Sequence, residues 1–334
     1  MIRRSLVKLA NPQLLALVGV LLINWLLFPN FFRVTWQDGR FFGSLIDVLN
    51  RGAPVAILAI GMVGVIATKG VDLSVGAVMA VAGAVAATMV VAGYPAPIAV
   101  VAALTVGLLC GLWNGVLVAI LDIQPIIATL VLMVAGRGIA QLITEGFIVT
   151  FTDPTLVYIG TGSFLGFPMA AVIALVLAIV VTLIVRRTAI GLFIEAVGVN
   201  RAAASLAGIR SRMLLLLVYS LSGFCAAIAG IIVAGDIRGA DANNAGLWLE
   251  LDAILAVVIG GTSLLGGRFS VPLAVIGALI IQAMNTGILV SGFPPEFNLI
   301  VKAGLIFIVL VIQSPLASRL APARLRPATK GAAK

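Results

Sequence analysis

Residues 55–76 read VAILAIGMVGVIATKGVDLSVG, an apolar run that is broken at 68–74 and then resumes. The same alternation of apolar runs and short polar breaks recurs along all 334 residues. Hydrophobic residues make up 62% of the chain and charged residues only 10%, and the mean hydropathy is +1.24. A soluble domain has about 25% charged residues, so the solvent for most of this surface must be lipid. The sequence predicts an all-α membrane protein.

Ten apolar blocks predict about ten transmembrane helices, because a spanning helix needs roughly 20 apolar residues. The eighth block is short and rich in glycine. No small-residue cleavage pattern of a signal peptide follows the first block, so we expect the first helix to be retained. The predicted spans are 13–29, 50–69, 73–92, 97–121, 126–146, 168–186, 213–234, 251–266, 271–291 and 298–313.

Basic residues gather on alternate breaks, which favours positively charged cytoplasmic loops over a nucleic-acid surface as the origin of the net charge of +9. This bias and the even number of spans predict that both termini are cytoplasmic. We expect one transmembrane domain over 1–313 and a basic, disordered tail over 314–334. The residues on the predicted cytoplasmic side are Arg3, Arg4, Lys8, Lys69, Arg186, Arg187, Arg201, Arg210, Arg212, Arg268, Arg319, Arg324, Arg326, Lys330 and Lys334.

A faint internal repeat divides the chain into two halves. Gly93-Tyr-Pro-Ala-Pro-Ile98, which leads to Asn114, is echoed by Gly267-Arg-Phe-Ser-Val-Pro-Leu273, which leads to Asn285. Five spans per half is an odd number, so the two halves would enter the membrane in opposite senses, as the inverted repeats of transporters do. The alternative is that Gly, Pro and Asn recur by chance in Ala/Val-rich helices.

The composition excludes several kinds of chemistry. The chain has no His, and its two Cys, Cys110 and Cys225, lie inside apolar blocks. The usual ligands of zinc, haem and iron–sulfur centres are therefore missing, as is a disulfide framework. No GxxxxGK[ST] phosphate loop occurs in the sequence. We expect no metal site, no cofactor in this chain and no ATP hydrolysis by it.

Polar residues between or inside apolar blocks are the candidates for a substrate path. Asp72 and Ser74 either cap the helix that follows them or face a water-filled route for a hydroxyl-rich solute. Asn114 and Asn285 either bind a solute or hold helices together. The outer loop over 235–252, the most polar of the chain, adds Glu250 and Asp252 at a predicted helix start.

Arg137 lies near the middle of the fifth predicted span, where a charge costs about 2.5–3.5 kcal/mol. It must face a carboxylate, backbone carbonyls or water. Gln141 is one turn further on the same helix face. Asp252, or less plausibly Glu145, is a candidate ion-pair partner. A structural ion pair and a role in the path stay open as alternatives.

The longest cytoplasmic break contains a complete miniature helix at 200–207. Asn200 is its expected N-cap, three alanines form its body and Gly208 is its terminator. Such a short helix is not stable alone in water. It therefore docks either into a cleft of another protein or onto its own bundle. On the opposite side, the 235–252 loop either meets an extracytoplasmic partner, lines the mouth of the path or is a hydrated connection, and the candidates for docking are Asp236, Arg238 and Asp241.

Three segments carry a resemblance to a known family: Gly70-Val-Asp-Leu-Ser-Val-Gly76, Glu195-Ala-Val-Gly-Val-Asn200 with Ala202-Ala203 and Gly208-Ile209, and Val258-Ile-Gly-Gly-Thr-Ser-Leu-Leu-Gly-Gly267. From about Ile46 to Gln313 the chain resembles the simple-sugar (ribose/xylose-type) permeases of bacterial ABC importers. Within that family it is most similar to galactofuranose permeases, on Gln37-Asp-Gly-Arg40, the 235–252 loop, Met284-Asn-Thr-Gly-Ile288 and Ser291-Gly-Phe-Pro-Pro-Glu296. It departs from the family at Lys69, where a small residue is common.

The resemblance implies a multi-pass protein of the bacterial inner membrane that moves a monosaccharide by alternating access. It implies three kinds of partner besides lipid: a cytoplasmic ABC ATPase that binds the ATP, a periplasmic sugar-binding protein and a second permease. Galactofuranose systems pair two different permeases, so we expect a heterodimer. By resemblance, the residues that couple to the ATPase are Glu195, Gly198, Asn200, Arg201, Ala202, Ala203, Leu206 and Gly208.

Other functions are weighed against this one. Permeases for branched-chain amino acids, nucleosides and furanosyl signals share the layout, and no spacing in the sequence separates a furanose from a pyranose. An ion-coupled secondary transporter would need a carboxylate at the membrane centre, whereas the acidic residues here lie at the ends of predicted spans. An intramembrane enzyme is disfavoured by the absence of His and of a buried acidic pair.

Overall fold

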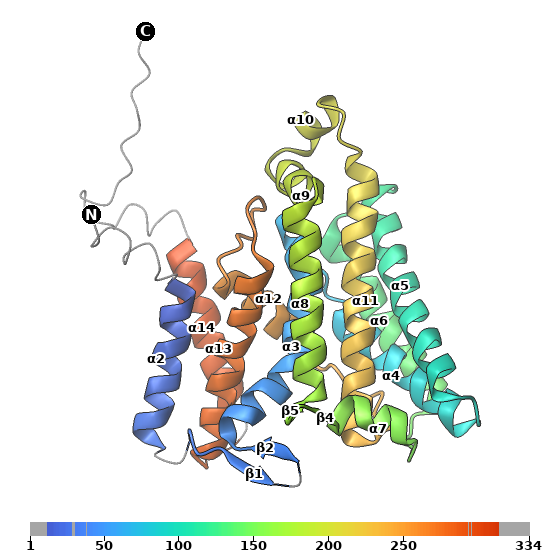
Figure 1. Cartoon of the computed structure of the whole chain (residues 1–334). Coiled ribbons are helices and arrows are strands. Elements are labelled where there is room, and N and C mark those ends of the chain that lie inside the picture. The colour runs from blue at the N-terminus through green and yellow to red at the C-terminus, as the bar shows by residue number, and fades with distance from the viewer. Residues whose placement is uncertain (1–11, 29–30, 38, 293, 295, 314–334) are drawn as a thin grey trace.

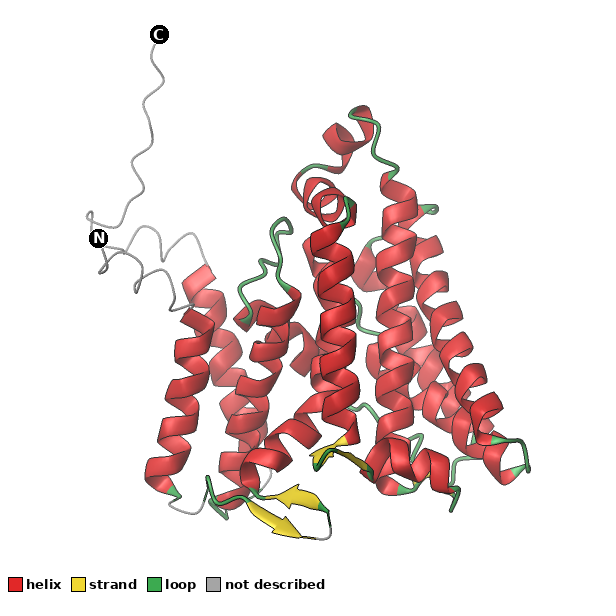
Figure 2. Cartoon of the chain, viewed as in Figure 1, coloured by secondary structure: helices red, strands yellow, loops and turns green. Residues whose placement is uncertain are grey.

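The computed structural model describes residues 12–28, 31–37, 39–292, 294 and 296–313, and the chain in these ranges is mostly helical (Figures 1 and 2). Arg3, Arg4, Lys8 and the predicted tail over 314–334 lie outside the described residues. The helices are α2 (Pro12–Leu27), α3 (Ser44–Ala67), α4 (Val75–Val91), α5 (Ala96–Ala119), α6 (Pro125–Ile143), α7 (Pro154–Thr161), α8 (Met169–Arg187), α9 (Ile190–Val199), α10 (Arg201–Leu206), α11 (Ser211–Ile237), α12 (Leu249–Ile259), α13 (Val271–Val290) and α14 (Phe297–Gln313).

In the part of the chain that the structure describes, three antiparallel strand pairs lie in the connections between helices. β1 (Thr35–Gln37) pairs with β2 (Arg40–Phe42), and β4 (Ser163–Phe164) pairs with β5 (Phe167–Pro168). The third pair joins distant parts of the chain, because β3 (Val149–Thr150) follows α6 and β6 (Gly239–Ala240) follows α11. This pair ties the two connections together.

Among the described residues, six helices are long and apolar enough to cross a membrane: α3, α5, α6, α8, α11 and α13. The prediction of a multi-span helical protein is thereby confirmed, while the count of ten spans stays a prediction. The bounds predicted for the eighth span, 251–266, are wrong for a continuous helix. α12 has 11 residues, or about 16 Å at 1.5 Å per residue, against a hydrocarbon core of about 30 Å. The helix ends at Gly260 and Gly261, the latter at φ +90°, and α7 and α9 are helices that the sequence did not predict.

α3 and α11 form the centre of the bundle. They pack against each other, and most of each helix is buried. α4 and α5 pack on α11, and α12 and α13 pack on α3. The approach of α5 to α11 is close because Gly107 and Gly111 face the backbone of Gly223 and Tyr219, where any added Cβ would collide. Small residues in place of larger side chains thus let these helices touch.

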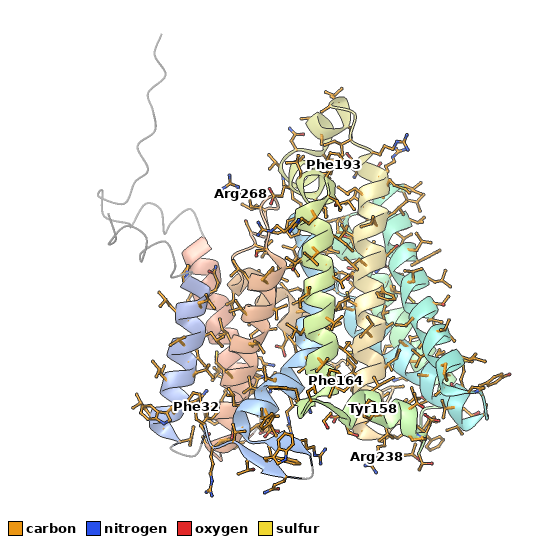
Figure 3. The ribbon with its side chains drawn as sticks, in the orientation of Figure 1. Phe32, Tyr158, Phe164, Phe193, Arg238 and Arg268 are labelled. Carbon is orange, nitrogen blue, oxygen red and sulfur yellow. The ribbon has the colours of Figure 1, made fainter. Side chains whose placement is uncertain are left out.

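The two ends of the bundle differ in structure. The end that we call the α10 end carries α9, α10 and the 260–270 connection, with Phe193 and Arg268 on it (Figure 3). The opposite end, called the α7 end, carries α7 and the β1–β2 and β4–β5 pairs (Figure 1). Phe32, Tyr158 and Arg238 lie there (Figure 3). A helix that starts at one end must cross the apolar interior to reach the other.

Candidate functional site

The first turns of α4 and α12 meet inside the bundle. The chain leaves α3 at Ala67 and re-enters the interior over 68–74 before α4, and it leaves α11 at Ile237 and re-enters over 238–248 before α12. Gly76 and Gly246 are both buried and in backbone contact, because a Cβ on either would collide with the carbonyl oxygen of the other. Discontinuous helices whose N-terminal ends point at a common centre are typical of transporter binding regions.

Asp72, Ser74 and Asn114 come together in one buried cluster. Oδ1 of Asp72 accepts hydrogen bonds from the backbone N (3.0 Å) and Oγ (2.6 Å) of Ser74, and Oδ2 accepts one from Oγ of Ser222 (2.8 Å). Nδ2 of Asn114 donates to Oγ of Ser74 at 2.8 Å. Since Asp72 is 1% exposed, the cluster is closed to solvent in this conformation. It fastens the 68–74 break to α5 and α11.

This cluster corrects two expectations from the sequence. Ser74 occupies the N-cap position of α4, but its side chain makes no capping hydrogen bond, because its hydroxyl donates to Asp72 instead. Asp72 bonds Ser74 itself rather than a free N–H of the first helical turn. The second expectation was that acidic residues lie at span ends. Asp72 does follow α3 in the sequence, but the break folds inward and places its carboxylate beside Ser222, in the middle of α11.

Arg137 and Gln141 hold the 238–248 connection rather than an acidic side chain. Nη1 of Arg137 donates to the carbonyl oxygens of Ala242 (2.9 Å) and Ala245 (2.7 Å), and Nε2 of Gln141 donates to Oδ1 of Asn243 (2.8 Å). The suggested ion pair of Arg137 with Asp252 is therefore wrong, and backbone carbonyls, the other alternative, are its partners. The connection enters the bundle beside α6 and presents its carbonyls there, which stabilises the buried charge.

A polar cavity of about 270 Å³ lies toward the α7 end, between α3, α11, α12, α13 and α14. At roughly 30 Å³ per liquid water, it has room for about nine waters or for one small solute. The sequence predicted Asp252 and Asn285 for the path, and both line this cavity. The polar residues that line it are Asn50, Arg51, Asp236, Asp252, Gln282, Asn285 and Lys302.

The polar cavity contains a buried ion pair. Nζ of Lys302 lies 2.7 Å from Oδ2 of Asp252, whose side chain is only 6% exposed. Side-chain amides from α3 and α13 add hydrogen-bond donors and acceptors, namely Asn50, Gln282 and Asn285. Donors and acceptors together suit the hydroxyl groups of a sugar, each of which both donates and accepts.

Four residues of the polar cavity were missed from the sequence. Asn50 and Arg51 begin an apolar block and look like interface residues, although they lie nearly two turns inside α3. Gln282 is a single polar residue in an apolar helix. Lys302 lies five residues inside α14. A charge in that position was the available signal, because an intramembrane charge calls for a buried partner.

The predicted miniature helix is present as α10. Oδ1 of Asn200 accepts from the backbone N of Ala203 at 3.0 Å, and Gly208 follows the helix at φ +86°. Ala202 and Ala203 are exposed, and Leu206 is 91% exposed, so α10 presents small and apolar side chains to its surroundings. Arg201 is bound to its own bundle, through an ion pair with Asp122 at 3.0 Å.

α9 connects α10 to the bundle. Gly198 packs so closely on the carbonyl oxygen of Ala67 and the backbone N of Gly267 that a Cβ there would collide. Gly267 itself donates to Ala67 at 2.9 Å. Glu195, on the same helix, is half-buried. The end of α3, the end of α9 and the 260–270 connection thus form one contact.

The three residues expected to dock an extracytoplasmic protein all lie at or near the α7 end. Asp236 sits in the last turn of α11 and lines the polar cavity. Arg238 ends α11 in a left-handed conformation and is exposed. Asp241 accepts from the backbone N of Asn243 and Asn244, and the hydrogen bond from the Asn244 side chain lowers the pKa of Asp241 below its usual value. These contacts shape the 238–248 connection.

Comparison with known proteins identifies the family. Residues 44–310 match the family described as the permease component of the branched-chain amino acid transport system. The chain belongs to this permease family. The galactofuranose transporter permease protein YtfT of Escherichia coli (strain K12) is 65% identical to it over 303 residues. The match covers 91% of this chain and 89% of the relative.

Two further relatives are permeases for other sugars. The fructose import permease protein FruF of Bifidobacterium longum is 40% identical over 91% of this chain and 87% of the relative. The ribose import permease protein RbsC of Escherichia coli (strain K12) is 38% identical over 91% of this chain and 93% of the relative. No solved structure gives a significant match. The resemblance to sugar ABC permeases is confirmed.

Proposed function

We propose that this chain is the membrane-spanning permease subunit of a bacterial ABC importer for galactofuranose. The observation that carries the proposal is the 65% identity to a galactofuranose permease over nearly the whole of both chains. Fructose and ribose are the second choice, because the permeases for them are 40% and 38% identical over a similar length. Specificity for one ring form rests with the binding protein in this proposal.

The polar cavity is where the sugar first meets the permease. It lies toward the α7 end and offers the Asp252–Lys302 pair and several amides to sugar hydroxyls. Onward movement requires the contact between Gly76 and Gly246 to open, since the first turn of α4 meets the connection before α12 there. The polar residues that surround or hold the two breaks next to this contact shape the path when it opens. They are Asp72, Ser74, Asn114, Arg137, Gln141 and Glu250.

The α10 end faces the cytoplasm in this proposal, and α10 docks on the ATPase. The exposed Leu206 and alanines suit a groove of another protein. The orientation is supported by the basic residues on connections at that end, such as Arg268 (Figure 3). A matching set of helix contacts in the two halves supports two inverted repeats of five predicted spans each. α4 and α5 of the first half pack on α11, and α12 and α13 of the second half pack on α3 in the same way.

The complete transporter needs further subunits. The relatives are permeases, and we propose that this one works with a cytoplasmic ABC ATPase that binds ATP, a periplasmic sugar-binding protein and a second, different permease. The assembly lies in the inner membrane, with Asp236, Arg238 and Asp241 on the side of the binding protein. No cofactor is assigned to this chain, and one domain over 1–313 with a tail over 314–334 is retained as the domain proposal.

Reconstitution tests the proposal directly. Proteoliposomes containing this chain, the second permease and the ATPase, supplied with the binding protein and ATP, are expected to take up labelled galactofuranose faster than ribose. Omission of ATP or of the ATPase should abolish uptake. If the chain alone carries sugar and an uncoupler stops it, an ion-coupled transporter is the correct reading and the ABC proposal is wrong.

A double variant tests the coupling role of α10. Asn200→Pro combined with Gly208→Val removes the N-cap and forces a β-branched residue into the left-handed position at φ +86°. We expect this variant to insert normally and to lose sugar-stimulated ATP hydrolysis. Normal uptake by the double variant would contradict docking through α10.

A further inference from the structure

A small pocket, which we call the outer pocket, lies at the α7 end of the bundle beside the polar cavity. It measures about 90 Å³. The first turns of α3, the end of α7 and the two strand pairs β1–β2 and β4–β5 contribute its lining (Figure 1). Its polar lining residues are Arg40, Asp47, Asn50, Thr161 and Ser163. Such side chains offer donors and acceptors to water or to the hydroxyl groups of a solute.

The outer pocket adjoins the polar cavity at two places. Asn50 lines both spaces, and Gly160, which lines the polar cavity, directly precedes Thr161, which lines the outer pocket. Along α3, the lining of the outer pocket runs from Ile46 to Asn50 and that of the polar cavity from Asn50 to Val55, so the second space continues the first toward the centre of the bundle. Within the described ranges, the half-buried Asn50 side chain makes no hydrogen bond to another protein group. Its amide is therefore available to a solute from either space.

Two short hairpins, β1–β2 and β4–β5, both contribute to the outer pocket and are joined to each other. The backbone N of Phe41 donates to the carbonyl oxygen of Gly166 at 2.9 Å. The ring of Phe41 packs on those of Trp36 and Phe167, with centroids 4.7 and 5.3 Å away. A two-stranded hairpin is only marginally stable by itself. As it stands, the outer pocket has room for about three waters at roughly 30 Å³ each, so a sugar can pass only after the hairpins move apart.

We propose that the outer pocket is the entrance through which the sugar reaches the polar cavity, and that the two hairpins are its lid. This inference rests on the proposed function, because it takes the α7 end as the side from which the sugar arrives. A segment that opens to admit a small ligand and then closes to exclude water is a common device in binding regions. Asn50 stands where the two spaces meet, and its amide exchanges hydrogen bonds with the sugar hydroxyls as the sugar passes.

Labelling of a thiol in the polar cavity tests whether the outer pocket leads there. Cys110 and Cys225 are replaced by alanine, and Asn285→Cys, which lines the polar cavity but not the outer pocket, is the reporter. The purified full chain is treated with a charged methanethiosulfonate. Ser163→Trp plugs the outer pocket and should slow the modification by about tenfold or more, equivalent to about 1.4 kcal/mol of added barrier. Thr155→Trp, at an exposed position of α7 outside both spaces, is the matched control and should leave the rate unchanged.

A reversible cross-link tests the lid in the complete transporter. In the same cysteine-free background, Phe41→Cys and Phe167→Cys, whose native rings are in contact, are joined by a short bifunctional methanethiosulfonate. The cross-link should stop sugar uptake, and a reductant should restore it. A monofunctional reagent of the same size is the control, and it should leave most of the uptake.

The outcomes separate this inference from the proposed function. Equal labelling rates in Ser163→Trp and Thr155→Trp, a reporter thiol that is never modified, or full uptake with the lid cross-linked would each overturn the entrance. If the native transporter takes up no galactofuranose, the proposed function fails, while the labelling rates of the purified chain still decide whether the outer pocket leads to the polar cavity. Should Ser163→Trp fail to fold, Thr161→Trp is the second plug and must give the same slowing.

Discussion

The side-chain nitrogen of Lys69 lies 3.0 Å from the carbonyl oxygen of Val199, to which it donates a hydrogen bond. Val199 is the last residue of α9, and Lys69 is the second residue of the break between α3 and α4. A cation at a helix C-terminus is stabilised by the helix dipole. This bond therefore joins the segment that carries α10 to the break that leads to Asp72. It also gives the Lys69 side chain a structural role.

Lys69→Met is expected to weaken the link between α10 and the 68–74 break. The loss in stability should be small, because the lysine is exposed, but sugar-stimulated ATP hydrolysis should fall several-fold in the reconstituted transporter. Lys69→Arg keeps a cation and should retain most of the stimulation. Equal stimulation in Lys69→Met and the native chain would show that the bond carries no signal.

Leu206→Asp tests the docking surface without disturbing the fold. Leu206 is 91% exposed at the end of α10, so a charge there should leave the melting temperature unchanged within about 1 °C, as expected for a surface change below roughly 0.5 kcal/mol. Co-purification of the ATPase with the permease should be lost, because an apolar contact is replaced by a charge. The control is Leu265→Asp, which is 80% exposed in the neighbouring connection and should retain the ATPase.

Gly246→Ala should damage the contact between the two broken helices. Gly246 has φ +73°, a conformation that costs alanine about 1–2 kcal/mol, and its new Cβ would also collide with the backbone of Gly76. Gly93→Ala is the matched control, since Gly93 has φ +87° with no atom within 4 Å. Thermal unfolding in detergent should show a larger loss for Gly246→Ala, and uptake should fall only in that variant. Similar losses for both would mean that the collision is relieved by a small shift.

Asp72→Ala should destabilise the bundle more than Ser222→Ala. Removal of the carboxylate leaves the Ser74 and Ser222 donors without their acceptor, and a buried unpaired polar group costs about 1–3 kcal/mol. Ser222→Ala removes one of the hydrogen bonds and leaves the others. Chemical or thermal denaturation in detergent measures both. A stability of Asp72→Ala equal to that of the native chain would argue that the cluster is wet rather than closed.

Asp252→Asn should leave Lys302 without its ionic partner in the polar cavity. Breaking a fully buried pair costs roughly 3–5 kcal/mol, and we expect about 2 kcal/mol here because the Lys302 side chain is 18% exposed. The exchanged pair Asp252→Lys with Lys302→Asp should recover part of the stability. Sugar uptake that falls in the single variant and stays low in the stable exchanged pair would indicate that the individual groups bind the solute.

Some features could be read from the sequence because they depend on local patterns. Apolar blocks located α3, α5, α6, α8, α11 and α13 to within a few residues at most ends, since their length and hydropathy suffice to define a spanning helix. Asn200 and Gly208 predicted α10 because capping and left-handed termination act over only a few residues. For α12 the start was predicted to within two residues. The end was placed too late, because the apolar run continues past the glycines that end the helix.

The candidate site was predicted less completely than the fold. Asp72, Ser74 and Asn114 were all named, but not that they bond one another, with Asn114 lying 40 residues from Ser74 along the chain. Arg137 was predicted to face a carboxylate such as Asp252, backbone carbonyls or water, and only the structure shows that the carbonyls of Ala242 and Ala245 are its partners. No local sequence pattern predicted that Asn50 and Lys302 line the same cavity as Asp252.

The sequence by itself determined that this chain is a helical membrane protein, and its motifs determined the family. Lipid solvent leaves few backbone solutions, so composition and block length are enough for the first, and short spacings are enough for the second. The tertiary structure alone decided that two breaks fold back into the bundle until Gly76 and Gly246 touch. It also decided that Asp252 pairs with Lys302 in the polar cavity. Those choices depend on contacts between residues far apart in the chain, where close packing and the cost of an unpaired buried charge select one arrangement among many.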